Sequence, residues 1–234
     1  MEIDEQLSAA VKSHRGTAAA DRLCELCVEL LGVDAAAITL ILDGGNSATL
    51  GVSSSAARVF DEVQFTMGEG PCLQAVADRA PVLVPDLGGV DPERWPMYTP
   101  ALLEMDVHSV HAIPVVLAGE CLGALDLFRH EAGPLAAEQL AGALAAAQLA
   151  ELPLLDLLAD DLRETVRDPG STGWAELDAM SRVEISQATG MIVAQLDVDP
   201  GEALVRLRAH AFATGRSASD VANDILDRRL RLEA

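Results

Sequence analysis

Residues 109–128 read SVHAIPVVLAGECLGALDLF, and this stretch decides the fold of the first part of the chain. Two apolar runs rich in valine and leucine flank an Ala-Gly-Glu turn, a pattern that predicts a β-hairpin. Further strands are predicted around a Gly-Gly turn within 35–54 and in PVLVPDL at 81–87. Together these segments indicate an antiparallel sheet.

Helical patterns surround the predicted strands. The N-terminal stretch through Leu31 is predicted to be helical: Thr17 can cap a segment of it in which leucines recur at helical spacing, and Gly32 ends it. RVFDEV at 58–63 predicts a short helix, and Pro71 begins another after a glycine turn. The order of elements predicts an α+β fold, in which an antiparallel sheet carries flanking helices.

From Pro134 onward the pattern is helical. Leucines and alanines over 134–167 predict a long helix that Pro153 should kink or break. This helix either packs on its own domain or pairs with a second copy of the chain. The turn residues DPGSTGW at 168–174 predict a boundary before a last domain.

The last domain reads as a small all-α three-helix bundle. Asp199, Pro200 and Glu202 supply an N-cap, a proline at the first helical position and a capping carboxylate for its second helix. Gly215 ends that helix, and Ser217 begins the third.

The first helix of this bundle, VEISQATGMIVAQL at 183–196, has a glycine in its middle. Its predicted core stripe consists of apolar side chains at helical spacing: Ile185, Ala188, Ile192 and Leu196. Gly190 lies opposite that stripe and costs about 1 kcal/mol relative to alanine. Close approach of another backbone, a protein partner or a phosphate would compensate for it.

Charge is unevenly divided along the chain. The formal net charge of −21 disfavours non-specific nucleic-acid binding, because phosphates are bound mainly by Lys and Arg. Residues 203–231, in contrast, hold six arginines and three aspartates, so a locally basic surface is compatible with the sequence. A solvated helical face is the simpler alternative.

No membrane span or signal peptide is predicted. The apolar runs stop well short of eighteen residues, and the N-terminus is acidic and amphipathic. The four cysteines are scattered, as expected of reduced thiols in a cytoplasmic protein.

The segments SRVEISQATGMIVAQL, PGEALVRLRAHAFATGR and SASDVANDIL resemble the ANTAR domain, a helical RNA-binding output module of bacterial antitermination regulators. The resemblance covers about residues 176–231. Thr189 stands where the family usually has a lysine, so a phosphate-binding charge is absent there.

The first part of the chain resembles a GAF sensor domain over about residues 8–131. The resemblance rests on LLGVDAAAITLIL, FTMGEGPCLQAV and the hairpin that ends in GECLGALDLF. We therefore expect a GAF-like sensor domain at 1–133, a helical linker at 134–170 and an ANTAR-like RNA-binding domain at 171–234.

These resemblances imply a cytosolic sensory regulator that couples a GAF-domain signal to RNA binding and controls transcription termination by antitermination. They imply stem-loop leader transcripts as the RNA partner and a homodimer as the binding form. The candidate RNA-binding residues are Arg182, Gln187, Thr189, Gly190, Arg206, His210 and Arg216. The alternative is a signalling or dimerisation protein that does not bind RNA, in which Gly190 and Ala194 support contact between two copies.

A small-molecule ligand of the GAF-like domain is expected near RWPMYTPALLEMDVHSVH at 94–111, which borders the pocket of such domains. The candidates are the larger side chains of this segment: Trp95, Met97, Tyr98, Met105, His108 and His111. Closure of the core is the alternative use of these residues.

Other chemistry has weaker support in the sequence. Cys72 follows Pro71 at a predicted helix start, where the helix dipole can lower a thiol pKa, so redox sensing is a hypothesis and a small buried cysteine is its alternative. Cys24 and Cys27 have no second pair or nearby histidines, so no metal site is predicted. No nucleotide loop or catalytic triad pattern occurs, so the sequence identifies no enzyme activity and no cofactor.

Overall fold

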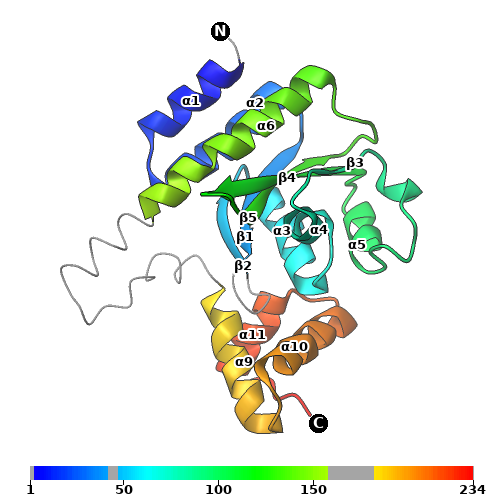
Figure 1. Cartoon of the computed structure of the whole chain (residues 1–234). Helices are drawn as coiled ribbons and strands as arrows, with labels where there is room; N and C mark the ends of the chain where they lie inside the picture. The colour runs from blue at the N-terminus through cyan, green and yellow to red at the C-terminus, as the bar shows by residue number, and fades with distance from the viewer. Residues whose placement is uncertain (1–2, 42–46, 158–181, 234) are drawn as a thin grey trace, which may run out of the picture.

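The computed structural model describes residues 3–41, 47–157 and 182–233 (Figure 1). Residues up to 157 form a domain built on a five-stranded antiparallel sheet with helices on both faces, here called the sheet domain. Residues 182–233 form a helical bundle beside it. The predicted α+β fold, with a small helical bundle behind it, is confirmed.

The sheet has the strand order β2-β1-β5-β4-β3. Its strands are β1 (Ala35–Ile41), β2 (Ser47–Val52), β3 (Val82–Val84), β4 (Ser109–Leu117) and β5 (Glu120–Arg129). The hairpin of β4 and β5 is the one predicted from residues 109–128, and Leu117 pairs with Glu120 across its turn. Ala118 and Gly119 both have positive φ, at 52° and 86°, as a type I′ hairpin turn requires.

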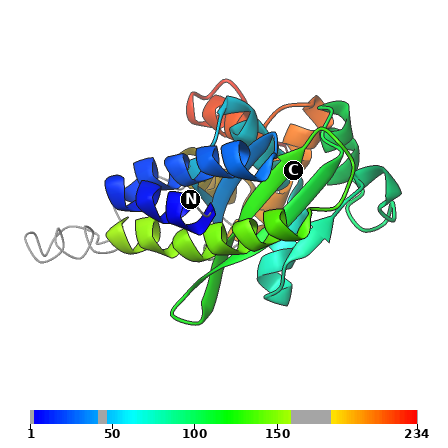
Figure 2. The same ribbon diagram turned by 90° about the horizontal axis from the view of Figure 1, so that it is seen from above.

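Helices α2 (Gly16–Leu31) and α6 (Ala137–Leu149) cover one face of the sheet, and α1 (Ile3–Ser13) packs on both of them (Figure 2). The single predicted N-terminal helix is in fact two, because Gly16 takes a positive φ of 53° and turns the chain. Arg15, and not Thr17, is the N-cap of α2. Gly32 ends α2 in the left-handed conformation, as predicted.

Helix α6 packs on its own domain. Its small side chains Ala143, Ala146 and Ala147 are buried in the core that α1 and α2 share with the sheet. Helical structure is interrupted at Ala150 and resumes over 151–157, consistent with Pro153, which has no N–H to donate to the carbonyl four residues before it. The stretch Ala137–Leu157 has the length and hydropathy of a membrane span, but much of it is covered by the rest of the domain.

The other face of the sheet carries α3 (Ser55–Met67), α4 (Pro71–Asp78), the 3-10 turn η2 (Leu87–Gly89) and α5 (Tyr98–Glu104). Helix α3 is longer than the predicted 58–63, because Ser54 caps its start and Gly68 ends it in the left-handed conformation. Pro71 begins α4, as predicted.

The bundle consists of α9 (Val183–Leu196), α10 (Pro200–Thr214) and α11 (Ala218–Leu226). The predicted N-caps and the predicted helix end are present: Asp199 accepts from the Glu202 amide, Ser217 accepts from the Asp220 amide, and Gly215 is left-handed. The carboxylate of Glu202, predicted to cap the helix start, accepts instead from Arg206. Of the predicted stripe on α9, Leu196 is only half-buried and the other members are buried. The predicted end of the long helix after 157 and the predicted boundary at 168–174 lie outside the described residues.

Candidate functional site at the junction of the two domains

The bundle docks on α3, which α10 and α11 both contact (Figure 1). The contact centres on Phe65, which projects from α3 into the core of the bundle and is 4% exposed. The guanidinium carbons of Arg182 and Arg208 lie 4.2 and 4.5 Å from the centroid of the Phe65 ring. A desolvated arginine over an aromatic ring is attracted by the negative charge of the ring face. One aromatic ring of the sheet domain therefore binds two arginines of the bundle.

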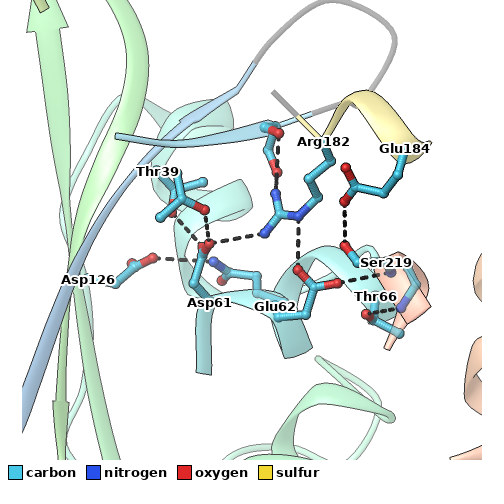
Figure 3. A network of polar contacts seen from close by, with 12 residues as sticks. Thr39, Asp61, Glu62, Thr66, Asp126, Arg182, Glu184 and Ser219 are labelled. Carbon is cyan, nitrogen blue, oxygen red and sulfur yellow. Dashed lines mark hydrogen bonds and ion pairs between the residues drawn. The ribbon is translucent and has the colours of Figure 1, made fainter. Parts of the chain in front are cut away.

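Arg182, at the start of α9, is buried in a polar network with the sheet domain (Figure 3). Its Nε donates to Glu62 Oε2 at 2.9 Å, and its Nη2 donates to Asp61 Oδ2 at 3.1 Å. Its Nη1 donates to the hydroxyl of Ser47 at 2.5 Å and to the Ser47 carbonyl at 3.2 Å. Each guanidinium nitrogen thus has a partner on the sheet domain.

Asp61 is held in place by the sheet independently of Arg182. Thr39 Oγ1 donates to its Oδ1 at 2.5 Å, and Thr49 Oγ1 donates to its Oδ2 at 2.7 Å. The two hydroxyls come from neighbouring strands, so the carboxylate is oriented by the sheet domain alone. A buried carboxylate with an oriented oxygen favours a cation that can donate to it.

A second row of contacts binds the first turn of α11 (Figure 3). Thr66 Oγ1 accepts from the Ala218 amide at 3.0 Å, and Glu62 Oε1 accepts from the Ser219 amide at 3.3 Å. Ser219 Oγ donates to Glu184 Oε1 at 2.8 Å, which ties α11 to α9. First-turn amides of a helix have no acceptor within the helix, so α3 supplies the acceptors that α11 lacks.

Asp126, on β5, lies behind this network and is also buried. Gln64 Nε2 donates to its Oδ2 at 3.3 Å. Burial and the nearby carboxylate of Asp61 raise the pKa of Asp126 to about 8. At neutral pH Asp126 is therefore mainly protonated, and the negative charges next to Arg182 are those of Asp61 and Glu62.

The structure corrects the expectation for Cys72. The side chain is fully buried. Burial and the nearby carboxylate of Asp126 raise the pKa of its thiol well above its usual value, so the predicted lowering is wrong. The start of α4 faces the core, where loss of hydration outweighs the helix dipole. The redox hypothesis loses its physical basis, and Cys72 is the small buried cysteine of the alternative.

Three of the six expected ligand-binding residues belong to the core and not to a pocket surface: Trp95, Tyr98 and His111. Burial and the nearby Arg129 lower the pKa of His111 to about 4. His108 lies at the surface beside Asp106. Core packing was the alternative use of these side chains, and Trp95, Tyr98 and His111 are used in that way.

Met97 and Met105 line a cavity of about 570 Å³ between the two domains. Its walls are α3, the segment around α5, and the end of α10 with the following turn, where Phe212 and Arg216 lie. The cavity lies at the junction of the domains, beside the polar network. Glu62 and Thr66 belong to both, and the turn at Ser217 also borders both.

The expected RNA-binding residues do not form one surface. Gln187 and Gly190 are exposed on the outer side of α9, Thr189 is half-buried, and the three other residues are on α10 or in the turn after it: Arg206, His210 and Arg216. A Cβ on Gly190 would meet nothing within 4 Å among the described residues, so no close approach within that part of the chain explains this glycine. Arg182 corrects the expectation, because it is only 8% exposed and faces the sheet domain.

Two of the exposed arginines are paired within the bundle. Arg206 lies 2.7 Å from Glu202, and Arg216 lies 2.7 Å from Asp224. Among the described residues, no group of three or more His, Cys, Asp or Glu side chains is placed to hold a metal ion.

The sequence interpretation missed the residues of α3 that bind the bundle: Asp61, Glu62 and Phe65. One signal was present. Ala57, Asp61 and Gln64 share a helical face that is otherwise apolar, which places a carboxylate on the buried side of a helix. A buried carboxylate requires a cation or several donors, and that requirement points to a missing partner.

Two family models match the chain. The model described as GAF domain matches residues 17–152, and the model described as ANTAR domain matches residues 176–226. No curated protein matches.

Solved structures resemble the sheet domain. The GAF domain of a phosphoenolpyruvate-protein phosphotransferase from Coxiella burnetii is 22% identical with a TM-score of 0.53, covering 65% of this chain and 91% of that chain. The GAF domain of the Acinetobacter phosphoenolpyruvate-protein phosphotransferase is 10% identical with a TM-score of 0.50 and covers the same shares, 65% and 91%. At these identities the likeness shows the fold alone.

Proposed function

Because the chain belongs to the GAF domain family and carries an ANTAR domain behind its GAF domain, we propose that it is a sensory regulator in which the GAF domain controls RNA binding by the ANTAR domain. The RNA partner in this proposal is a leader transcript with paired stem-loops, and the outcome is control of transcription termination. The observation that carries the proposal is the docking of the bundle on α3 through Arg182, which couples the two domains directly.

In this proposal the RNA surface includes the outer side of α9, Arg206 on α10 and Arg216 in the turn after it. Gly190 leaves open space on that side, where the backbone of a partner or a phosphate can approach. Arg206 pairs with Glu202, and Arg216 pairs with Asp224 and donates to the Asp220 carbonyl, so the described partners of both side chains lie in their own domain. Exposed ion pairs contribute about 0–1 kcal/mol, so a phosphate can replace either carboxylate at little cost.

We place the sensed small molecule in the cavity between the domains. Met97 and Met105, two of the residues expected to contact a ligand, lie on its walls. The ANTAR domain supplies the opposite wall, so a ligand there would contact both domains at once. A ligand that binds one arrangement of the domains better than another shifts the equilibrium between them.

Binding of a synthetic RNA with two stem-loops to the full chain tests the RNA part of the proposal. Affinity should fall steeply with salt concentration, and Arg206→Ala should lower both the affinity and the salt dependence, with the slope of log K against log salt reduced by ~0.7–0.9. Arg79→Ala is the matched control, since Arg79 also forms an exposed ion pair, with Glu120, but lies on the sheet domain. A folded protein that does not bind, or binds without salt dependence, would contradict the proposal.

The second candidate is a dimerisation module that does not bind RNA, and the open face at Gly190 also favours it. Sedimentation velocity separates the two candidates. If Gly190→Leu dissociates a dimer while the wild-type protein does not bind the RNA, the second candidate replaces the first.

A further inference from the structure

We propose that α3 of the GAF domain is an arginine-binding surface that holds the ANTAR domain in a docked state and withholds Arg182 and Arg208 from RNA. This inference rests on the proposed RNA-binding function and adds its regulation. The surface consists of Asp61, Glu62, Phe65 and Thr66.

Arg182 cannot contact a phosphate in this arrangement. Its nitrogens donate to Ser47 and to the carboxylates of Asp61 and Glu62, and its guanidinium face lies over Phe65. Carboxylate and phosphate oxygens accept the same pairs of N–H donors from a guanidinium. The GAF domain and an RNA backbone therefore compete for one side chain.

Arg208 is withheld by the same ring. Its guanidinium lies 4.5 Å from the Phe65 centroid, and its side chain lies against Gly68 at the end of α3. Burial and the neighbouring charge of Arg182 lower the pKa of Arg208, so its charge is held at some cost in the docked state. Undocking would separate both arginines from the Phe65 ring and Arg182 from its two carboxylates.

The junction has the composition of a contact that can open. Its described interactions include two ion pairs, the hydrogen bonds of Arg182 to Ser47, hydrogen bonds to the first turn of α11 and one shared aromatic ring. The loss of hydration largely offsets the attraction between buried ions, so such a contact is specific without being strongly stabilising. An interface of this kind can be displaced by a competing anion.

The Ala218 and Ser219 amides report docking without a label. They donate to Thr66 and Glu62 of the GAF domain, so undocking should accelerate their hydrogen exchange. The Asp220 amide, one residue further, donates to Ser217 within the ANTAR domain and is an internal control. Exchange at Asp220 should stay unchanged as long as the bundle is folded.

The experiment compares Glu62→Lys with Glu93→Lys in the full chain, by exchange at these amides and by affinity for the two-stem-loop RNA. Both substitutions add the same charge to the sheet domain, but Glu93 is exposed and lies away from the contacts of Arg182. We expect Glu62→Lys to accelerate exchange at Ala218 and Ser219 and to tighten RNA binding, each by at least about tenfold relative to Glu93→Lys. Glu62→Gln should act in the same direction by a smaller factor, and it serves if the lysine variant does not fold.

Three results would overturn the proposal or separate it from the proposed function. Unchanged exchange at Ala218 and Ser219 in a folded Glu62→Lys protein means that α3 does not hold the bundle. Accelerated exchange with RNA affinity equal to that of Glu93→Lys means that docking does not compete with RNA. If neither wild type nor any variant binds RNA, the proposed function fails, and the exchange data still decide whether α3 holds the bundle.

Discussion

Replacing Asp126 by asparagine should change how the stability of the protein depends on pH. Asp126 is buried beside Asp61, Cys72 and Gln64, and its pKa is raised from 3.8 to about 8. Between these two values the folded protein keeps a proton that the unfolded chain releases. The unfolding free energy of the wild type therefore falls as pH rises through this range.

The size of this change in unfolding free energy follows from the binding of one proton by Asp126. A single group that is protonated in the folded state and ionised in the unfolded state changes the unfolding free energy by ~1.4 kcal/mol per pH unit. From pH 5 to pH 7 the carboxyl of Asp126 should therefore remove ~2.7 kcal/mol of stability from the wild type. Asparagine does not titrate, and its amide oxygen can still accept from Gln64.

The assay is urea unfolding at pH 5, 6 and 7, followed by far-ultraviolet circular dichroism. Asp126→Asn should gain ~2.7 kcal/mol relative to wild type between pH 5 and pH 7, whichever protein is more stable at pH 5. His111, with its pKa lowered to about 4, destabilises the fold as pH drops below 6.5, and it does so equally in both proteins. It therefore cancels from the difference.

Asp4→Asn is the control, because Asp4 is exposed on α1. It should leave the pH profile parallel to that of the wild type. If the profiles of Asp126→Asn and wild type are parallel as well, Asp126 does not hold its proton to pH 7, and the assignment of the local charge to Asp61 and Glu62 is wrong.

Three further predictions test the fold and the candidate surface. Gly190→Ala should stabilise the protein by ~1 kcal/mol in thermal unfolding, because its Cβ meets open space on α9, and a loss of stability would contradict that placement. Gly123→Ala should destabilise by ~1–3 kcal/mol in urea, because its Cβ would clash with the Thr39 carbonyl oxygen across the sheet, and wild-type stability would refute this close approach. Cys72 should resist iodoacetamide at pH 8 until the protein unfolds, as mass spectrometry of the labelled peptides can show, whereas rapid labelling of the folded protein would revive the redox hypothesis.

The sequence predicts those parts of the fold that depend on short-range signals. The hairpin at 109–128 follows from alternating apolar runs around a glycine turn, and Gly32, Gly215 and Ser217 mark helix ends through their own backbone preferences. The division of the first helix at Gly16 escapes this reasoning, because the leucine spacing around it is compatible with one continuous helix.

The candidate site was predicted less well, because its residues are far apart in the sequence. Arg182 contacts Ser47 and Asp61, and more than 120 residues of chain separate Asp61 from Arg182. The periodicity of a sequence shows which side of a helix is buried, but it does not show which residue packs against that side. As an arginine in the ANTAR-like segment, Arg182 is of a residue type that often binds RNA, but its position in the structure makes it a contact between the two domains. In the sequence, only Asp61, a carboxylate on the buried face of α3, indicates the contact between the domains.

The resemblance to the ANTAR domain leads us to expect a lysine at the position of Thr189, and this departure bears on the same question as the burial of Arg182. In the docked state, Arg206 and Arg216 are paired with Glu202 and Asp224, and Thr189 contributes no charge. The exposed pairs cost little to exchange for phosphate, whereas Arg182 is bound by two carboxylates at once. If RNA binding needs more positive charge than the exposed arginines provide, undocking adds the charges of Arg182 and Arg208. The substitution of lysine by threonine would then make RNA binding depend more strongly on the GAF domain.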